Sequence, residues 1–187
     1  MTIDWKRIGI GDLAAIVTRK LTEKGLDSLV VGGACVSIYT ENRYLSGDID
    51  LVSHAALKQI TAALAELGFS KQQSRHFVRN DCPFFIEFVS PPAAVGKEQI
   101  RSTKKLRTKF GTIVLLTPTD CVKDRLAAFF HWSDPQALEQ GIMVAQAQPI
   151  NLKAIKKWSA DEGYPDKFRL FSDRLNRLPR KRRQTST

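Results

Sequence analysis

Two short segments carry the pattern that decides the fold: Val31-Gly32-Gly33-Ala34 and, further along, Ser46-Gly47-Asp48-Ile49-Asp50-Leu51-Val52. The first ends an apolar run, 29–31, which predicts a buried strand, a tight glycine turn and the start of a helix. Gly32 and Gly33 would let backbone amides approach a phosphate at the positive end of that helix. In the second segment a strand would point Asp48 and Asp50 to the same face.

Neighbouring carboxylates at the edge of a core predict a metal site. Asp48 and Asp50 repel one another, and both stay ionised only if a cation lies between them. Oxygen ligands favour a hard ion such as Mg²⁺, or Mn²⁺. Glu87 lies inside the apolar run 84–89, where an unpaired buried carboxylate costs several kcal/mol. The alternatives are a polar turn with salt bridges for the aspartates, and a half-exposed strand with one outward glutamate for Glu87.

The remaining pattern predicts an α/β (α+β) fold, with a small mixed sheet, flanking helices and a C-terminal helical extension. Residues 1–116 should form the core, 117–179 a helical region packed on it, and 180–187 a basic, disordered tail. Helices are expected at about 10–24, 34–39 and 55–67, and strands at 29–31, around 49–51, 84–89 and 112–116. In the second half, Thr117, Asp134 and Asn151 should begin helices, and Pro165 should open a last one.

Composition limits the classes of function. The chain has 187 residues, with 29 Lys and Arg against 19 Asp and Glu, for a net charge of +10. Such a charge favours nucleic acid, nucleotides or an acidic membrane face as partners, or reflects only basic tails. The three cysteines, Cys35, Cys82 and Cys121, form neither a disulfide framework nor a zinc motif, which favours reduced thiols and a cytoplasmic location. Dispersed histidines favour surface or core positions, and no stretch resembles a membrane span or signal core.

Basic residues gather in two places, the segment 97–109 and the cluster 180–183. They are expected to bind RNA phosphates, with Lys104, Lys105 and Arg107 the candidate contacts, or to be a solvated loop and a charged tail. The aromatic residues of the second half recur at helical spacing and are expected in the core rather than on a base-stacking surface: Trp132, Trp158, Tyr164 and Phe168.

These motifs resemble the polymerase-β-type nucleotidyltransferase superfamily, and within it the minimal and AbiEii-type toxin nucleotidyltransferases. The specific resemblance covers 29–89: a strand, Gly-Gly, a helix, Asp-x-Asp on the next strand, and an acidic residue on a third. A looser one extends through Asp124-Arg125-Leu126 to Asp134. Arg125 stands where the family motif has lysine, and no arginine precedes Asp134. A role as a helix N-cap also explains the aspartate at position 134.

The resemblance implies a two-metal mechanism. Asp48 and Asp50 would hold Mg²⁺ on the triphosphate of an NTP, and Glu87 would help hold a second ion that lowers the pKa of an acceptor hydroxyl. That hydroxyl attacks the α-phosphorus in line, and pyrophosphate leaves. Gly32, Gly33 and Ser46 would contact phosphates. Arg43 and Lys123 would neutralise the triphosphate, or would be a solvated loop arginine and a solvated helix lysine.

The acceptor stays open at this stage. RNA such as tRNA, a protein, or a small molecule such as an aminoglycoside would each supply the hydroxyl. Two other functions compete with the enzyme: a catalytically inactive RNA- or protein-binding module that keeps the fold, and a member of a toxin–antitoxin pair with a small helical partner.

Overall fold

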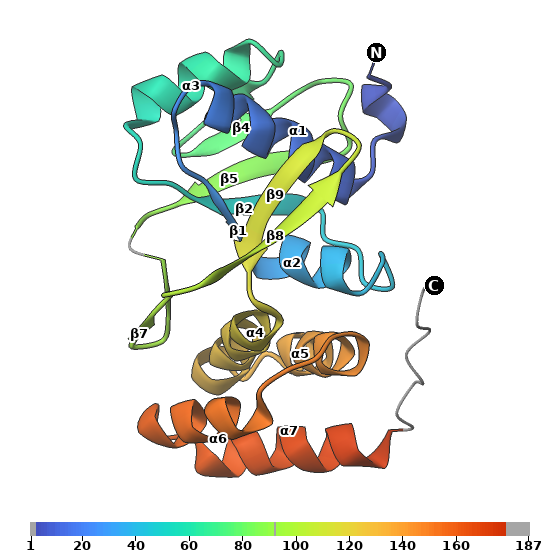
Figure 1. Cartoon of the computed structure of the whole chain (residues 1–187), viewed down its shortest axis with the longest axis vertical. Coiled ribbons are helices and arrows are strands. Elements are labelled where there is room, and N and C mark those ends of the chain that lie inside the picture. The colour runs from blue at the N-terminus through green and yellow to red at the C-terminus, as the bar shows by residue number, and fades with distance from the viewer. Residues whose placement is uncertain (1–2, 92, 179–187) are drawn as a thin grey trace.

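One mixed sheet organises the first half of the chain in the computed structural model, which describes residues 3–91 and 93–178 (Figure 1). Its strand order is β3-β4-β5-β2-β1-β9-β8. The strands are β1 (Leu29–Val31), β2 (Asp48–Val52), β3 (Ser70–Lys71), β4 (His76–Val78), β5 (Phe85–Val89), β8 (Thr103–Thr108) and β9 (Gly111–Leu116). A separate hairpin joins β6 (Ala94–Val95) to β7 (Glu98–Gln99). The strands β2 and β5 pair in parallel, as do β1 and β9, whereas β1 and β2 are antiparallel.

The register divides the sheet into two faces. Ile49 and Leu51 of β2, with Val30 of β1, point to one face and are fully buried. The helices α1 (Ile10–Glu23) and α3 (Leu57–Ala65) lie together along this side of the sheet (Figure 1). The apolar alternation of β2 thus fills the core, and its intervening residues, Asp48 and Asp50, are left for the other face.

The second half is helical. It comprises α4 (Pro118–Trp132), α5 (Pro135–Ala147), α6 (Leu152–Asp161) and α7 (Pro165–Arg177), which stack below the sheet (Figure 1). The helix α2 (Gly32–Tyr39) contacts both α4 and α5, and a 3-10 turn, η1 (Trp5–Arg7), precedes α1. An aromatic cluster holds the bundle: the ring of Phe130 stacks on Trp158 and Tyr164, with centroids 5.5 and 5.0 Å away.

The predicted helix starts are confirmed. The side chains of Thr117, Asp134 and Asn151 accept hydrogen bonds from the N–H groups of Asp120, Gln136 and Ala154 at 3.1, 2.9 and 3.0 Å. Pro165 occupies the first turn of α7. Since Asp134 is engaged in this cap, the N-cap interpretation of that residue holds.

Two expectations were wrong. The basic segment 97–109 is not a loop, because it contains β7 and the whole of β8, which pairs with β9 along its whole length. The strand carries no apolar alternation since it lies at the sheet edge and is exposed on both faces. Trp132 is 78% exposed at the end of α4, whereas Trp158 and Phe168 are in the core as expected.

The expected tail, 180–187, lies outside the described residues. Among the described helices, none has the length and apolar character needed to cross a bilayer.

Candidate active site

The site is built on the face of the sheet opposite α1 and α3. Asp50 pairs with Glu87 across the parallel strands β2 and β5, so the two carboxylates lie side by side, and Asp48 is two residues before Asp50. A carboxylate oxygen of each of the three residues lies within 4.8 Å of the other two. All three side chains are half-buried. The structure therefore brings the three sequence-predicted acids together in one cluster.

Crowding changes the proton affinity of the cluster. Burial, reinforced by the negative charges of Asp48 and Glu87, raises the pKa of Asp50 to about 6. A divalent cation bound between these oxygens would remove that repulsion, and an all-oxygen donor set is the one that Mg²⁺ and Mn²⁺ prefer. The residues present thus fit the metal that the motif implies.

The glycine pair lets the sheet and helix approach each other. Gly32 has a φ of +65°, and a Cβ at this position would overlap the Oδ2 atom of Asp50. A Cβ on Gly33 would lie 2.6 Å from Oγ of Ser46. Only glycine at position 32 tolerates both the positive φ and the close contact with Asp50. The turn therefore holds the N-terminus of α2 directly against the acidic cluster. The first turn of this helix presents backbone N–H groups without helical partners, which suit a phosphate.

Ser46 is buried, and its polar atoms form hydrogen bonds within the protein. Its Oγ donates a hydrogen bond to Oδ1 of Asp48 at 2.8 Å, and its N–H donates to Oγ of Ser37 at 2.9 Å. Ser46 therefore orients Asp48. Arg43, in the same loop, is exposed and donates from Nε to the carbonyl of Thr40 at 3.2 Å, at the end of α2.

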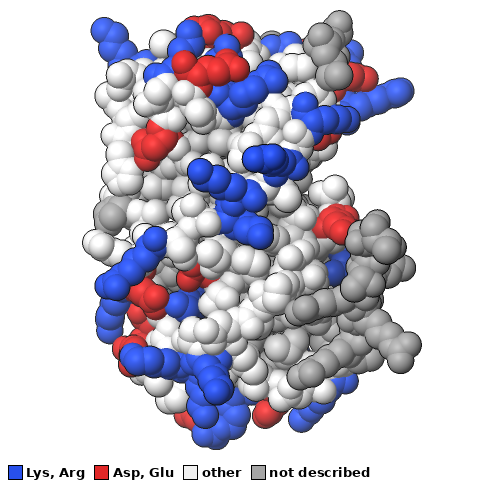
Figure 2. Space-filling view, viewed as in Figure 1, with Lys and Arg blue, Asp and Glu red and all other residues white. Residues whose placement is uncertain are grey.

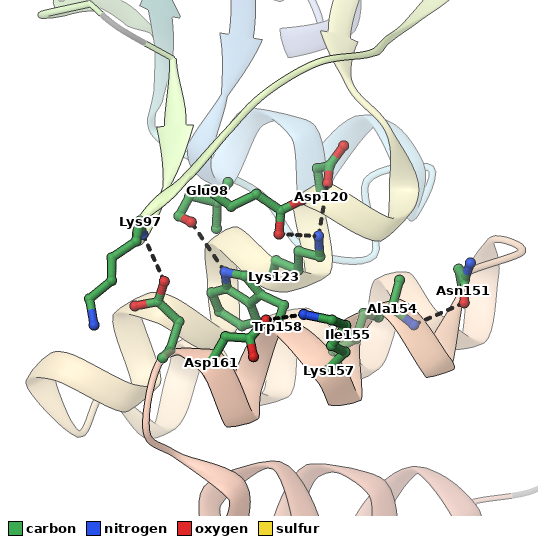
Figure 3. Close-up of polar contacts among 12 residues, drawn as sticks. Lys97, Glu98, Asp120, Lys123, Asn151, Ala154, Ile155, Lys157, Trp158 and Asp161 are labelled. Atoms are coloured by element: carbon green, nitrogen blue, oxygen red, sulfur yellow. Dashed lines mark hydrogen bonds and ion pairs between the residues drawn. The ribbon is translucent and has the colours of Figure 1, made fainter.

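Lys123 is not a solvated helix lysine, because it is 4% exposed. Its Nζ donates to Oε2 of Glu98 at 2.9 Å and lies 3.7 Å from Oδ1 of Asp120 (Figure 3). It faces a cavity of about 710 Å³ between the β6–β7 hairpin and α6. Lys123 therefore lies on the hairpin side of α4, with its charge already paired.

Arg125, two residues on, is the cation of α4 whose charge acts on the cluster. Its positive charge opposes the rise in the pKa of Asp50, whereas the charge of Asp124 adds to it. The guanidinium contacts Oδ2 of Asp124 at 2.6 Å and Oε1 of Gln140 at 3.3 Å. Asp124 also lines a small apolar cavity of about 140 Å³ whose floor includes Val31, Val52 and Val89. Sequence reasoning gave Arg125 no role, although it lies within the Asp-Arg-Leu motif.

Sequence reasoning also missed His76. It is the partner of Glu87 in the β4–β5 pairing, and its Nε2 lies 2.9 Å from Oε2 of Glu87. Its ring meets Phe85 edge to face, with centroids 5.1 Å apart. The strand β4 is too short for its alternation to be recognised, so only the pairing reveals this contact.

No protein-family model and no curated protein matches the chain. Among solved structures it is similar to ANT(2″)-Ia in complex with adenylyl-2″-tobramycin, with a TM-score of 0.51 and 10% identity over 85% of this chain and 94% of that one. It is also similar to an antigenic nucleotidyltransferase-like protein from Paracoccidioides brasiliensis, with a TM-score of 0.50 and 14% identity over 86% and 92% of the two chains. At such identities the likeness shows the fold, and the predicted nucleotidyltransferase fold is confirmed.

Proposed function

We propose that this protein is a metal-dependent nucleotidyltransferase, which moves an NMP from an NTP to an acceptor hydroxyl. The observation that carries the proposal is the convergence of Asp48, Asp50 and Glu87 within 4.8 Å on the sheet face that meets the N-terminus of α2. The acids supply a site for divalent ions and the helix start supplies a site for phosphate, so one place on the protein suits both parts of a metal-bound triphosphate.

Each residue has a distinct part in this proposal. Asp48, Asp50 and Glu87 would hold Mg²⁺ or Mn²⁺, which when bound neutralises the triphosphate and makes the acceptor hydroxyl more acidic. Ser46 keeps Asp48 in place, and the amides at Gly32 and Gly33 would face the phosphates. The acceptor hydroxyl loses its proton to water, its oxygen attacks the α-phosphorus in line, the bond to the bridging oxygen of the pyrophosphate breaks, and pyrophosphate leaves.

Three cations are proposed to balance the triphosphate. Arg125 already acts on Asp50 through its charge. Arg43 is exposed in the loop that carries Ser46. Lys123 would join them only after exchanging Glu98 for a phosphate oxygen, because Glu98 holds its Nζ at 2.9 Å.

Two observations bear on which molecule supplies the acceptor hydroxyl. The solved ANT(2″)-Ia complex contains adenylyl-2″-tobramycin, which supports a nucleotide donor and shows that this fold accommodates a small acceptor. The net charge of +10 favours a polyanionic acceptor for this chain, such as RNA. Membership of the AbiEii-type group, a small helical partner in a toxin–antitoxin pair, and a cytoplasmic location stay predictions of the sequence.

Transfer of label tests the activity directly. Each of the four NTPs, labelled at either the α- or the γ-phosphate, is incubated with the protein, Mg²⁺ and one acceptor pool: total RNA, total protein or an aminoglycoside mixture. We expect α-label, and no γ-label, to enter one pool, and the Asp48→Asn/Asp50→Asn variant to transfer none. Binding of Mg²⁺-NTP without transfer to any pool would favour the inactive binding module instead.

A further inference from the structure

The basic side chains of β8 are sorted between the two faces of the sheet. Lys105 and Arg107 pair with Val114 and Thr112 of β9, whereas Lys104 pairs with Leu115. Directly paired residues point to the same face, and successive residues alternate. Leu115 pairs with Val30, which points to the side of α1 and α3, so Lys104 points to that side, and Lys105 and Arg107 point to the opposite side.

That opposite side is the face of the acidic cluster. Asp50 pairs with Val31 of β1, and Val30 pairs with Leu115 of β9, which places Val31 and Leu116 together on the cluster's face. Leu116 pairs in turn with Thr103, the first residue of β8. Three strand spacings of about 4.8 Å put the start of β8 about 14 Å from Asp50 across this face. Lys105 and Arg107 continue from there along the strand, about 6.8 Å apart.

These charges are available to a partner. Within residues 3–91 and 93–178, neither Lys105 nor Arg107 forms an ion pair, and both are exposed. Lys109, which directly follows β8, differs in that its Nζ lies 3.9 Å from Oδ2 of Asp12. Lys and Arg side chains follow the course of β8 across the middle of the molecular surface (Figure 2). The strand β8 therefore presents uncompensated positive charge on the cluster's face of the sheet.

We propose that Lys105 and Arg107 bind backbone phosphates of an RNA whose hydroxyl is the acceptor. The claim that this RNA is the acceptor rests on the proposed nucleotidyl transfer, whereas the binding itself does not. A row of cations along a strand matches a polynucleotide, whose phosphates also follow one another in a row, and this row lies on the same face of the sheet as the acidic cluster. Lysine on an edge strand also discourages pairing with other strands, but that role applies equally to Lys104.

The sequence grouped Lys104 with Lys105 and Arg107 as a candidate contact, but its pairing with Leu115 points it away from the cluster's face, so it provides the control. The variant Lys105→Ala/Arg107→Ala is compared with Lys58→Ala/Lys104→Ala, which removes the same net charge from the other side of the sheet, where Lys58 lies exposed on α3. Binding of a fluorescein-labelled single-stranded RNA is measured by anisotropy over a series of salt concentrations. Thermal melts with and without Mg²⁺-NTP show that each variant folds and keeps its nucleotide site.

We expect wild-type affinity to fall steeply with salt, with a slope of log affinity against log salt that flattens by up to about 1.4 in Lys105→Ala/Arg107→Ala, at about 0.7 per phosphate contact. The control variant should keep the wild-type slope. Equal flattening in both variants, an unchanged slope in both, or no salt-dependent RNA binding by the wild type would each overturn the proposal. Failure of Mg²⁺-NTP to raise the wild-type melting temperature would instead count against the proposed transfer reaction and leave the RNA result standing.

Discussion

Gly32 and Asp50 are packed so closely that a Cβ atom on the glycine would overlap the Oδ2 atom of the aspartate. The glycine ends β1 and begins α2, and Asp50 is the paired neighbour of Val31 on β2. The position of the proposed metal-binding carboxylate and the position of the proposed phosphate-binding helix start therefore depend on one residue.

Gly32→Ala should separate these two features. The added methyl group must displace Asp50, and alanine is strained at a φ of +65°. We expect a loss of stability of about 1–3 kcal/mol and loss of the melting-temperature rise caused by Mg²⁺-NTP. Gly9→Ala is the control, because nothing lies within 4 Å of a Cβ there and the backbone is extended. An alanine variant at position 32 that kept the full Mg²⁺-NTP shift would show that the glycine does not position the site.

The raised pKa of Asp50 predicts a pH dependence of stability. Its pKa is about 6 in the folded protein, against an ordinary value of 3.8. Between those values the folded protein holds a proton that the unfolded chain has released, so this carboxyl makes folding less favourable as the pH rises. Above about pH 6 the effect is complete.

Asp50→Asn removes that titration. In EDTA, the melting temperature of the variant minus that of the wild type should increase from about pH 4 to about pH 6 and then level off. Differential scanning fluorimetry over this range measures it. A difference that stays constant with pH would show that the crowding of the three acids does not affect folding.

The ion pair between the buried Lys123 and the exposed Glu98 predicts the relative stability of two variants. Glu98→Gln leaves a buried ammonium with only Asp120, 3.7 Å away, whereas Lys123→Met removes the buried charge and keeps the aliphatic stem. Both variants should melt below the wild type, and Glu98→Gln should be the less stable. If Lys123 balances the triphosphate as proposed, Lys123→Met should also weaken the Mg²⁺-NTP shift while Glu98→Gln preserves it.

His76 should affect metal affinity through Glu87. Residues that hold a metal ligand in place are typically worth 10- to 100-fold in affinity, and we expect roughly that loss of Mn²⁺ affinity in His76→Ala. Gln at this position can donate a hydrogen bond to Oε2 of Glu87 and should recover part of the lost affinity. Isothermal titration with Mn²⁺ and a non-hydrolysable NTP analogue measures the constant. Equal affinities in wild type and His76→Ala would mean that Glu87 needs no such support.

The acidic cluster was predictable from the sequence because its residues follow the simplest rule of a strand. Asp48 and Asp50 alternate with buried residues, and Glu87 interrupts an apolar run, so each acid signals an unusual environment by itself. The helix caps were predictable because they depend only on neighbours in sequence: Thr117 and Pro118 act within one turn of the chain.

What could not be predicted depends on partners far apart in sequence. The buried Lys123 is paired with Glu98, which lies on a two-residue strand 25 positions earlier in the chain. The contact of His76 with Glu87 and the division of Lys104 from Lys105 follow from strand pairing, which local patterns do not specify. Trp132 lies at helical spacing but at the very end of α4, beyond the packed part of the bundle.

Binding of Mn²⁺ shows directly whether the three carboxylates form a metal site for a nucleotide. Free Mn²⁺ is followed by electron paramagnetic resonance while the ion is added to the protein with a non-hydrolysable NTP analogue. If they do, we expect saturable binding by the wild type that is lost in Asp48→Asn/Asp50→Asn and kept in Asp166→Asn, a control at an exposed residue of α7. Retention of the full wild-type binding by the double variant would contradict this expectation.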